Sequence, residues 1–179
     1  MAEAADHLRT VGELVDGLRG LGLEPVLVGG MALVLLGSRR VTRDFDFVVA
    51  QPGDRRTAMV ELFYDRGLEL ASRLDAAGNI VATIDNRRVA GARLRIDQPA
   101  GACFYNVTTG LRVDLLFDFP VAARELAGRA ARLKIRSHVL ARASEDDLLR
   151  LKRIAADARS VPGDADDIAF LESRRSRQK

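Results

Sequence analysis

Apolar positions in the first part of the chain recur every three or four residues, which predicts an amphipathic helix over about residues 5–19. Its apolar side chains are Leu8, Val11, Leu14, Val15 and Leu18. Gly20 and Gly22 come next, and glycines in that position favour the end of a helix. Similar spacing predicts further helices over residues 31–36, 52–66, 120–127, 145–159 and 165–171.

Short apolar runs and alternating runs predict the strands of a sheet. These runs cover residues 25–28, 44–49, 68–74, 93–96, 104–107, 112–117, 133–135 and 139–140. Thr108-Thr109-Gly110 would be the turn of a hairpin between two of them. Between residues 74 and 93 the pattern leaves strand, loop and short helix open. The fold class that we expect is therefore α+β, a mixed β-sheet core flanked by helices with a C-terminal helical pair.

The order of these elements suggests two parts. We expect a core over residues 1–140 and a C-terminal helical segment over residues 141–179 that closes a cleft. The segment ends in the basic tail Arg174-Arg175-Ser176-Arg177-Gln178-Lys179, which we expect to be solvated and frayed. Contact between this tail and RNA is the alternative.

Two carboxylates lie one residue apart in the predicted strand over residues 44–49. Side chains alternate along a strand, so Asp44 and Asp46 share one face while Phe45 and Phe47 share the other. Two carboxylates on one face repel each other unless a cation lies between them, and a hard divalent metal that carries phosphate is the usual occupant. Two surface acids would show the same alternation.

A glycine pair and a loop rich in hydrogen-bond donors precede these acids. Gly29 and Gly30 end an apolar run and open a helix, where backbone amides can approach a phosphate, although a tight turn needs the same residues. The loop that follows holds Ser38, Arg40 and Arg43 as further candidates for nucleotide binding. Its arginines could hold a triphosphate or form a surface salt-bridge cluster.

A third acid and a basic pair complete the candidate site. Asp114 lies between Val113 and Leu115 in a predicted strand, as a third metal ligand or a strand-edge acid would. In the helix over residues 145–159, which begins with the capping pattern of Ser144 and Asp147, Lys152 and Arg159 lie beside one apolar stripe. They would point into a cleft, where Arg159 is a further candidate for nucleotide binding, or extend to solvent. The stripe, expected to be buried, is Leu148, Leu151, Ala155 and Ala158.

Composition narrows the class of protein. The chain has 179 residues, of which 47% are hydrophobic and 30% charged, as is ordinary for a globular protein. Its single cysteine excludes an intrachain disulfide and a cysteine-type zinc site. No apolar run has the length of a membrane span and no signal peptide is evident, so we expect a cytoplasmic protein without a membrane partner. The net charge of +3 fits a polyanionic partner, but a bias toward arginine codons would also explain it.

The glycine pair, followed by thirteen residues and Asp44-Phe45-Asp46-Phe47, resembles the DNA polymerase β-type nucleotidyltransferase superfamily. The segments Gly37-Ser38-Arg39-Arg40-Val41-Thr42-Arg43, Ser144–Lys152 and Asp164–Ile168 look more narrowly like the AbiEii/MenT-type nucleotidyltransferases. This group includes toxins of bacterial toxin–antitoxin and phage-defence systems. The chain is shorter than many AbiEii-type members.

The resemblance implies an active site lined by Thr42, Asp44, Asp46, Lys152 and Asp167. Asp164 is a possible substitute for Asp167, and Arg40 would lie near the triphosphate. The implied metal is Mg²⁺ or Mn²⁺, held by Asp44 and Asp46, and the implied substrate is a nucleoside triphosphate. The third acid is not equally needed across this family, so Asp114 is the least secure metal ligand.

The activity implied for the MenT-type toxins is the addition of nucleotides to the 3′ acceptor end of tRNA. A cognate antitoxin protein would then be a second partner. Three alternatives stay open. The acceptor could be a small-molecule antibiotic or a protein hydroxyl, the chain could bind nucleotide or a partner without catalysis, or Asp44 and Asp46 could be surface acids.

Overall fold

The computed structural model describes residues 2–94, 101–158 and 163–177. Its helices are α1 (Ala2–Gly20), α2 (Gly29–Val34), α3 (Arg56–Tyr64), α4 (Arg87–Arg93), α5 (Ala123–Arg129), α6 (Glu145–Ala158) and α7 (Asp164–Arg177), with a 3₁₀ turn at Gly53–Arg55. Its strands are β1 (Val26–Val28), β2 (Asp44–Val49), β3 (Glu69–Leu74), β4 (Ile80–Ile84), β5 (Gly101–Tyr105), β6 (Arg112–Phe117), β7 (Ala131–Ile135) and β8 (His138–Arg142). The predicted α+β class is confirmed. None of these helices is long and apolar enough to cross a bilayer.

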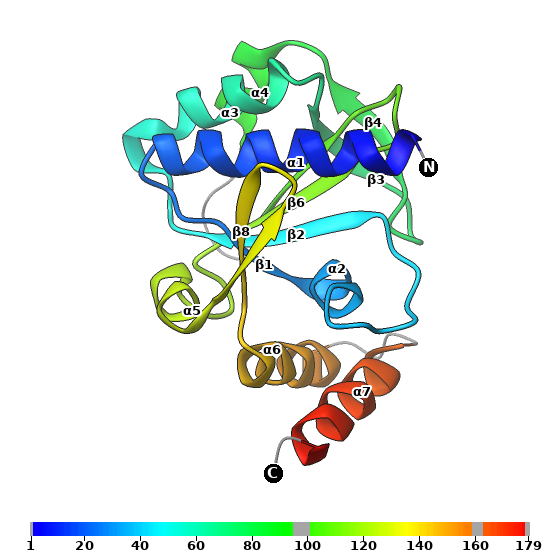
Figure 1. The fold of residues 1–179 in the computed structure, drawn as a ribbon. Helices are drawn as coiled ribbons and strands as arrows, with labels where there is room; N and C mark the ends of the chain where they lie inside the picture. Colours follow the sequence, from blue (N-terminus) through cyan, green and yellow to red (C-terminus); the bar gives the residue numbers. More distant parts are fainter. Residues whose placement is uncertain (1, 95–100, 159–162, 178–179) are drawn as a thin grey trace.

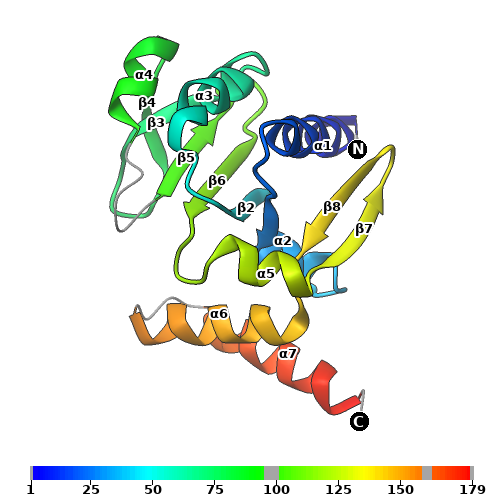
Figure 2. The ribbon, with the colours of Figure 1, turned by 90° about the vertical axis from the view of Figure 1, so that its left-hand side faces the viewer.

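The strands form one mixed sheet in the order β4-β3-β5-β6-β2-β1-β8-β7. The pairs β2–β6 and β1–β8 are parallel, and the other neighbours are antiparallel. Helices α1 and α3 cover one face of this sheet, while α2, α6 and α7 lie on the other side (Figures 1 and 2). Helices α6 and α7 pack on each other as the predicted C-terminal pair.

The alternation predicted for β2 holds. Phe45 and Phe47 are buried on the core side, and Asp44 and Asp46 are half-buried on the opposite face. The core is continuous from α1 through the centre of the sheet to α3, because each of these elements turns one apolar face inward. Strand β2 is therefore held by its phenylalanines, while its carboxylates remain available to a ligand.

The segment between β3 and β5 differs from the prediction. Residues 93–96 were expected to form a strand, but Arg93 ends helix α4 and Leu94 is in no strand; residues 95 and 96 lie outside the described part. The side chain of Asn86 accepts hydrogen bonds from the amides of Arg88 and Val89, at 3.0 and 3.2 Å. This N-cap starts a helix where apolar content alone favoured a strand.

The C-terminal helix extends beyond its predicted end, and the prediction of a frayed tail is wrong from Arg174 to Arg177. The guanidinium of Arg174 donates to both carboxylate oxygens of Glu145 at 3.0 Å and to the carbonyl of Leu36 at 2.9 Å. These contacts attach α7 to α6 and to the end of α2. An arginine-rich sequence suggested solvation, but a carboxylate from a distant segment holds the helix in place.

Candidate active site

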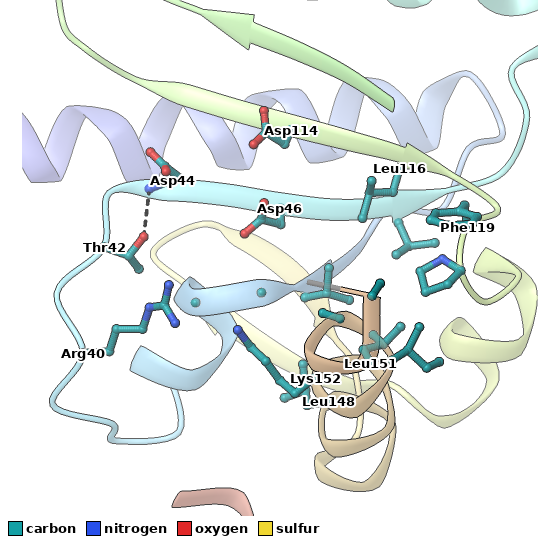
Figure 3. A pocket seen from close by; sticks show the side chains of 18 of the residues that line it. Arg40, Thr42, Asp44, Asp46, Asp114, Leu116, Phe119, Leu148, Leu151 and Lys152 are labelled. Carbon is teal, nitrogen blue, oxygen red and sulfur yellow. Dashed lines mark hydrogen bonds between the residues drawn. The ribbon is translucent and has the colours of Figure 1, made fainter. Parts of the chain in front are cut away.

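A cavity of about 520 Å³ lies between the carboxylate face of β2 and β6, the start of α2, and helix α6 (Figure 3). Its polar wall consists of Gly29, Gly30, Arg40, Thr42, Asp44, Asp46, Arg112, Asp114 and Lys152. The structure thus brings together polar residues from four separate stretches of sequence, including most of the predicted site.

The parallel register of β2 and β6 places Asp46 directly opposite Asp114. Burial, together with the neighbouring charges of Asp114 and Asp44, raises the pKa of Asp46 to about 6. Burial also raises the pKa of Asp44, although the positive charge of Arg112 opposes this shift. These three carboxylates form the acidic wall of the cavity. They carry more negative charge than the neighbouring residues stabilise.

Asp114 already has a cationic partner that the sequence analysis did not single out. Arg112 Nε lies 3.0 Å from one carboxylate oxygen of Asp114 and 3.2 Å from the other. Residues two apart in a strand share a face, so the sequence alone could have paired them. Arg112 also lines the cavity, where a nucleotide would meet its charge.

The acids offer oxygen ligands, which suit a hard divalent cation. The mutual repulsion that raises the pKa of Asp46 is the electrostatic setting that such a cation would relieve. No group of three or more acidic, histidine or cysteine side chains in the described ranges could by itself hold a metal. The residues fit a metal shared between Asp44, Asp46 and the oxygens of a substrate, while a part for Asp114 stays a prediction.

The two glycines let the start of α2 approach the acidic wall closely. A Cβ atom at Gly29 would lie 2.0 Å from Oδ2 of Asp46, and Gly29 has a φ of +67°, which few other residues adopt. A Cβ atom at Gly30 would lie 2.9 Å from Nε of Arg40. Gly29 is therefore required for the close approach to the carboxylate, whereas at Gly30 the flexible Arg40 side chain could shift.

Thr42 and Arg40 reach the site from the loop before β2. The hydroxyl of Thr42 accepts a hydrogen bond from the amide of Asp44 at 3.3 Å, which orders the start of the strand (Figure 3). Arg40 donates to the carboxylate of Asp167. Figure 3 shows Arg40 and Lys152 pointing toward one another beside the start of α2.

Lys152 is held by two acids of α7. Its Nζ lies 2.7 Å from Oδ2 of Asp167 and 3.2 Å from Oδ1 of Asp164, and all three side chains are largely buried. The other oxygen of Asp164 is buried without a hydrogen-bond partner among the described residues. Asp164 and Asp167 both bind Lys152, and which of them is the active-site acid stays a prediction. The amphipathic pattern of α6 that placed Lys152 beside the apolar stripe is consistent with its position at the cavity.

Three residues predicted to bind nucleotide are not placed at the cavity. The hydroxyl of Ser38 accepts from the amide of Arg40 at 3.2 Å, and Arg43 is exposed; neither lines the cavity in the described structure. Arg159 lies outside the described residues. Ser38 therefore has a local role in shaping the turn that presents Arg40.

The sequence analysis missed the apolar half of the cavity. It is formed mainly by Val48, Leu116, Phe119, Pro120, Leu148, Leu151 and Ile154. The stripe predicted as buried is buried at Leu148, half-buried at Leu151 and Ala155, and exposed at Ala158. Apolar spacing identifies the inward face of α6, but it cannot distinguish a packed core from an open cavity.

No protein-family model and no curated protein matches this chain. Solved structures do match its fold. The antibiotic-resistance factor ANT(2'')-Ia is 11% identical with a TM-score of 0.58, and the match covers 95% of this chain and 84% of that one. The lincosamide antibiotic adenylyltransferase LnuA, with lincomycin bound, is 11% identical with a TM-score of 0.56, over 92% of this chain and 96% of that one.

A third solved structure has the same arrangement. An antigenic nucleotidyltransferase-like protein from Paracoccidioides brasiliensis is 18% identical with a TM-score of 0.58, over 93% of this chain and 75% of that one. At these identities the likeness is one of fold. It agrees with the nucleotidyltransferase core expected from the glycine pair and the two aspartates of β2, so the chain has the fold of these solved nucleotidyltransferases.

Proposed function

We propose that this chain transfers a nucleoside monophosphate from a nucleoside triphosphate to an acceptor hydroxyl, with release of pyrophosphate. The observation that carries the proposal is the joining of three features in one cavity. Asp44 and Asp46 lie on its sheet wall, Gly29 of α2 lies close to Asp46, and Arg40 and Lys152 point in from opposite elements. Acids for a metal and cations for phosphate are what nucleotidyl transfer requires.

Asp44 and Asp46 would hold Mg²⁺ or Mn²⁺, which when bound polarises phosphate oxygens and offsets their charge. In the reaction the acceptor oxygen forms a bond to the α-phosphorus, and the bond from the α-phosphorus to the bridging oxygen of the β-phosphate breaks. The hydroxyl proton passes to the acidic wall. Negative charge that develops on the leaving pyrophosphate meets Arg40 and Lys152.

Both of these cations pair with Asp167. A triphosphate would compete with this carboxylate for the same donors, so binding would exchange one set of charge-assisted hydrogen bonds for another. Asp164 can retain Lys152 at the cavity wall during this exchange. The apolar half of the cavity would hold the nucleobase or an apolar part of the acceptor.

As the acceptor we propose first the 3′ end of tRNA, which would make the chain the toxin of a toxin–antitoxin or phage-defence system, with an antitoxin as partner. The motif resemblance and the net charge of +3 support this choice. A basic protein gains affinity for RNA through phosphate contacts.

The second candidate is a small-molecule antibiotic. Its support is the likeness in fold and size to LnuA, a lincosamide adenylyltransferase of which the match covers 96%. Leu116, Phe119 and Ile154 offer apolar area to such an acceptor. Most drug-sized ligands bury their surface against side chains of this kind.

A transfer assay tests the activity and separates the acceptors. The protein is incubated with Mg²⁺, each α-labelled nucleoside triphosphate, and total tRNA, lincosamides, aminoglycosides or lysate protein in separate reactions. We expect label on tRNA that is lost in Asp44→Asn and Asp46→Asn. Label on an antibiotic or on protein alone would replace the tRNA proposal, and no label on any acceptor with intact nucleotide binding would indicate a non-catalytic binding module.

A further inference from the structure

A second cavity, of about 330 Å³, lies at the end of β8 between the first turn of α6, α5 and α7. It shares no lining residue with the cavity of the candidate active site in the described ranges. Arginines from three elements line it: Arg129, Arg142 and Arg175. Three guanidinium groups so close together need negative charges nearby.

Three of the carboxylates near this cavity each have an arginine of their own. Arg129 binds both oxygens of Asp147, at 3.0 and 2.7 Å. Arg174 binds both oxygens of Glu145, and Arg175 Nε lies 3.6 Å from Asp146. These three acids form the first turn of α6, so their negative charges also stabilise the positive end of the helix dipole.

Arg142 differs from Arg129, Arg174 and Arg175, because it has no carboxylate within ion-pair distance among the described residues. Its side chain lines the cavity although the residue is only 9% exposed. It is the last residue of β8, where it pairs with Leu27 of β1. Its Nε donates to the carbonyl of Ala143 at 3.3 Å, a long hydrogen bond that leaves the two terminal nitrogens for another partner.

A buried guanidinium without a counter-anion is costly, because desolvation disfavours its charge. The pKa of Arg142 is accordingly lowered by burial, and the more distant Glu145 opposes this only in part. Arginine stays charged in proteins, so an anion from outside the chain would relieve this cost.

We propose that this second cavity binds one oxyanion group, a phosphate or a carboxylate of a small molecule, through the terminal nitrogens of Arg142. The planar guanidinium suits two oxygens of one such group. Arg129 and Arg175 at the wall add positive charge, and Leu149 and Leu171 exclude water from one side. The site is separate from the nucleotide cavity and does not depend on the function proposed for it.

The test is a thermal unfolding series at constant ionic strength, in which chloride is replaced by inorganic phosphate or, in a second arm, by acetate. Mass action stabilises a protein that binds an anion only in its folded state. We expect the midpoint to rise by about 2–4 °C in at least one arm, for the wild type and for Arg40→Gln, which removes a phosphate contact of the other cavity. Arg142→Met should lose this rise.

Two further variants keep the outcome clear. Arg142→Met without added anion should be at least as stable as the wild type, since it removes an uncompensated buried charge, whereas Arg142→Lys should fold with a weaker anion response. Arg153→Met, which changes an exposed arginine of α6 that does not line this cavity in the described ranges, should respond as the wild type. An unchanged anion response in Arg142→Met, or no response of the wild type to either anion, would overturn the proposal.

Discussion

Nζ of Lys152 lies 2.7 Å from Oδ2 of Asp167, and the same oxygen accepts a hydrogen bond from Arg40. Two cations from distant parts of the sequence thus bind one buried carboxylate oxygen in the first turn of α7. Under the proposed function, a phosphate oxygen would compete with this oxygen for the two cations. These ion pairs give Lys152 a structural role, the proposed function adds a catalytic one, and experiments can separate the two.

Replacement of Lys152 by methionine is expected to destabilise the fold by about 3–5 kcal/mol, because it leaves the buried carboxylates of Asp164 and Asp167 with too little positive charge. Chemical denaturation measures this loss, and the transfer assay should show no activity. Arg153→Met, at the next and exposed position, should change neither quantity substantially.

The double variant Lys152→Met/Asp164→Asn separates stability from activity. Removal of one carboxylate should restore much of the free energy of unfolding, since Arg40 still pairs with Asp167. Transfer should remain absent because the cation opposite the triphosphate is missing. Restored activity in this variant would show that Lys152 acts only through the stability of the fold.

Arg40→Gln is expected to raise the KM for the nucleoside triphosphate by about tenfold, since one charge-assisted contact to phosphate is lost. The melting temperature should change little, because Lys152 continues to pair with Asp167. Arg43→Gln is the matched control, as this exposed arginine comes from the same loop and does not line the cavity in the described structure. Equal effects of the two substitutions on KM would contradict the position assigned to Arg40.

Gly29→Ala is expected to lower transfer activity by about a hundredfold or more, because the new Cβ would lie 2.0 Å from the Asp46 carboxylate and displace it. Gly37→Ala provides the control. Gly37 also has a positive φ, +93°, but no atom lies within 4 Å of its added Cβ. Both variants should lose about 1–2 kcal/mol of stability from backbone strain, and only Gly29→Ala should lose activity.

Asp46→Asn is expected to stabilise the metal-free protein near pH 8 by up to about 3 kcal/mol, as judged from a folded-state pKa of about 6 against 3.8 in the unfolded chain. The folded carboxyl binds its proton more tightly, so the wild type carries this penalty above pH 6. The penalty declines as the pH falls from 6 toward 4, and the advantage of the variant should disappear there. Denaturation in a chelator at pH 8 and pH 4 measures the difference.

Asp157→Asn serves as the control for this pH series. Asp157 is exposed on α6, and its replacement should leave the free energy of unfolding within about 0.5 kcal/mol at both pH values. A stability gain for Asp46→Asn that is equal at pH 4 and pH 8 would show that the raised pKa of Asp46 is not its source.

Patterns within single elements were predictable because they depend on local geometry. The two-residue period of β2 placed Asp44 and Asp46 on one face and the phenylalanines on the other, as the structure has them. The predicted cap is present, since the amide of Asp147 donates to the hydroxyl of Ser144. The amphipathic pattern of α6 likewise agrees with the position of Lys152 beside the cavity. In each case the deciding neighbours lie within a few residues along the chain.

The remaining features of the site depend on which segments meet in space. The sheet register sets Asp114 opposite Asp46, and the packing of α7 on α6 brings Asp164 as well as Asp167 to Lys152. The turn of the loop before β2 directs Arg40 inward and leaves Arg43 exposed. Residue type alone could not choose between these arginines, since both have the same charge and similar local sequence.

The sequence by itself determined the chemistry of this protein: two acids on a strand after a glycine pair, and a lysine on an amphipathic helix. Only the tertiary structure decided which cations and acids meet, that half of the cavity is apolar, and that Arg142 is buried beside a second cavity. The reason is physical. Side-chain periodicity is a property of one element, whereas charge pairing and cavities arise between elements that are far apart in sequence.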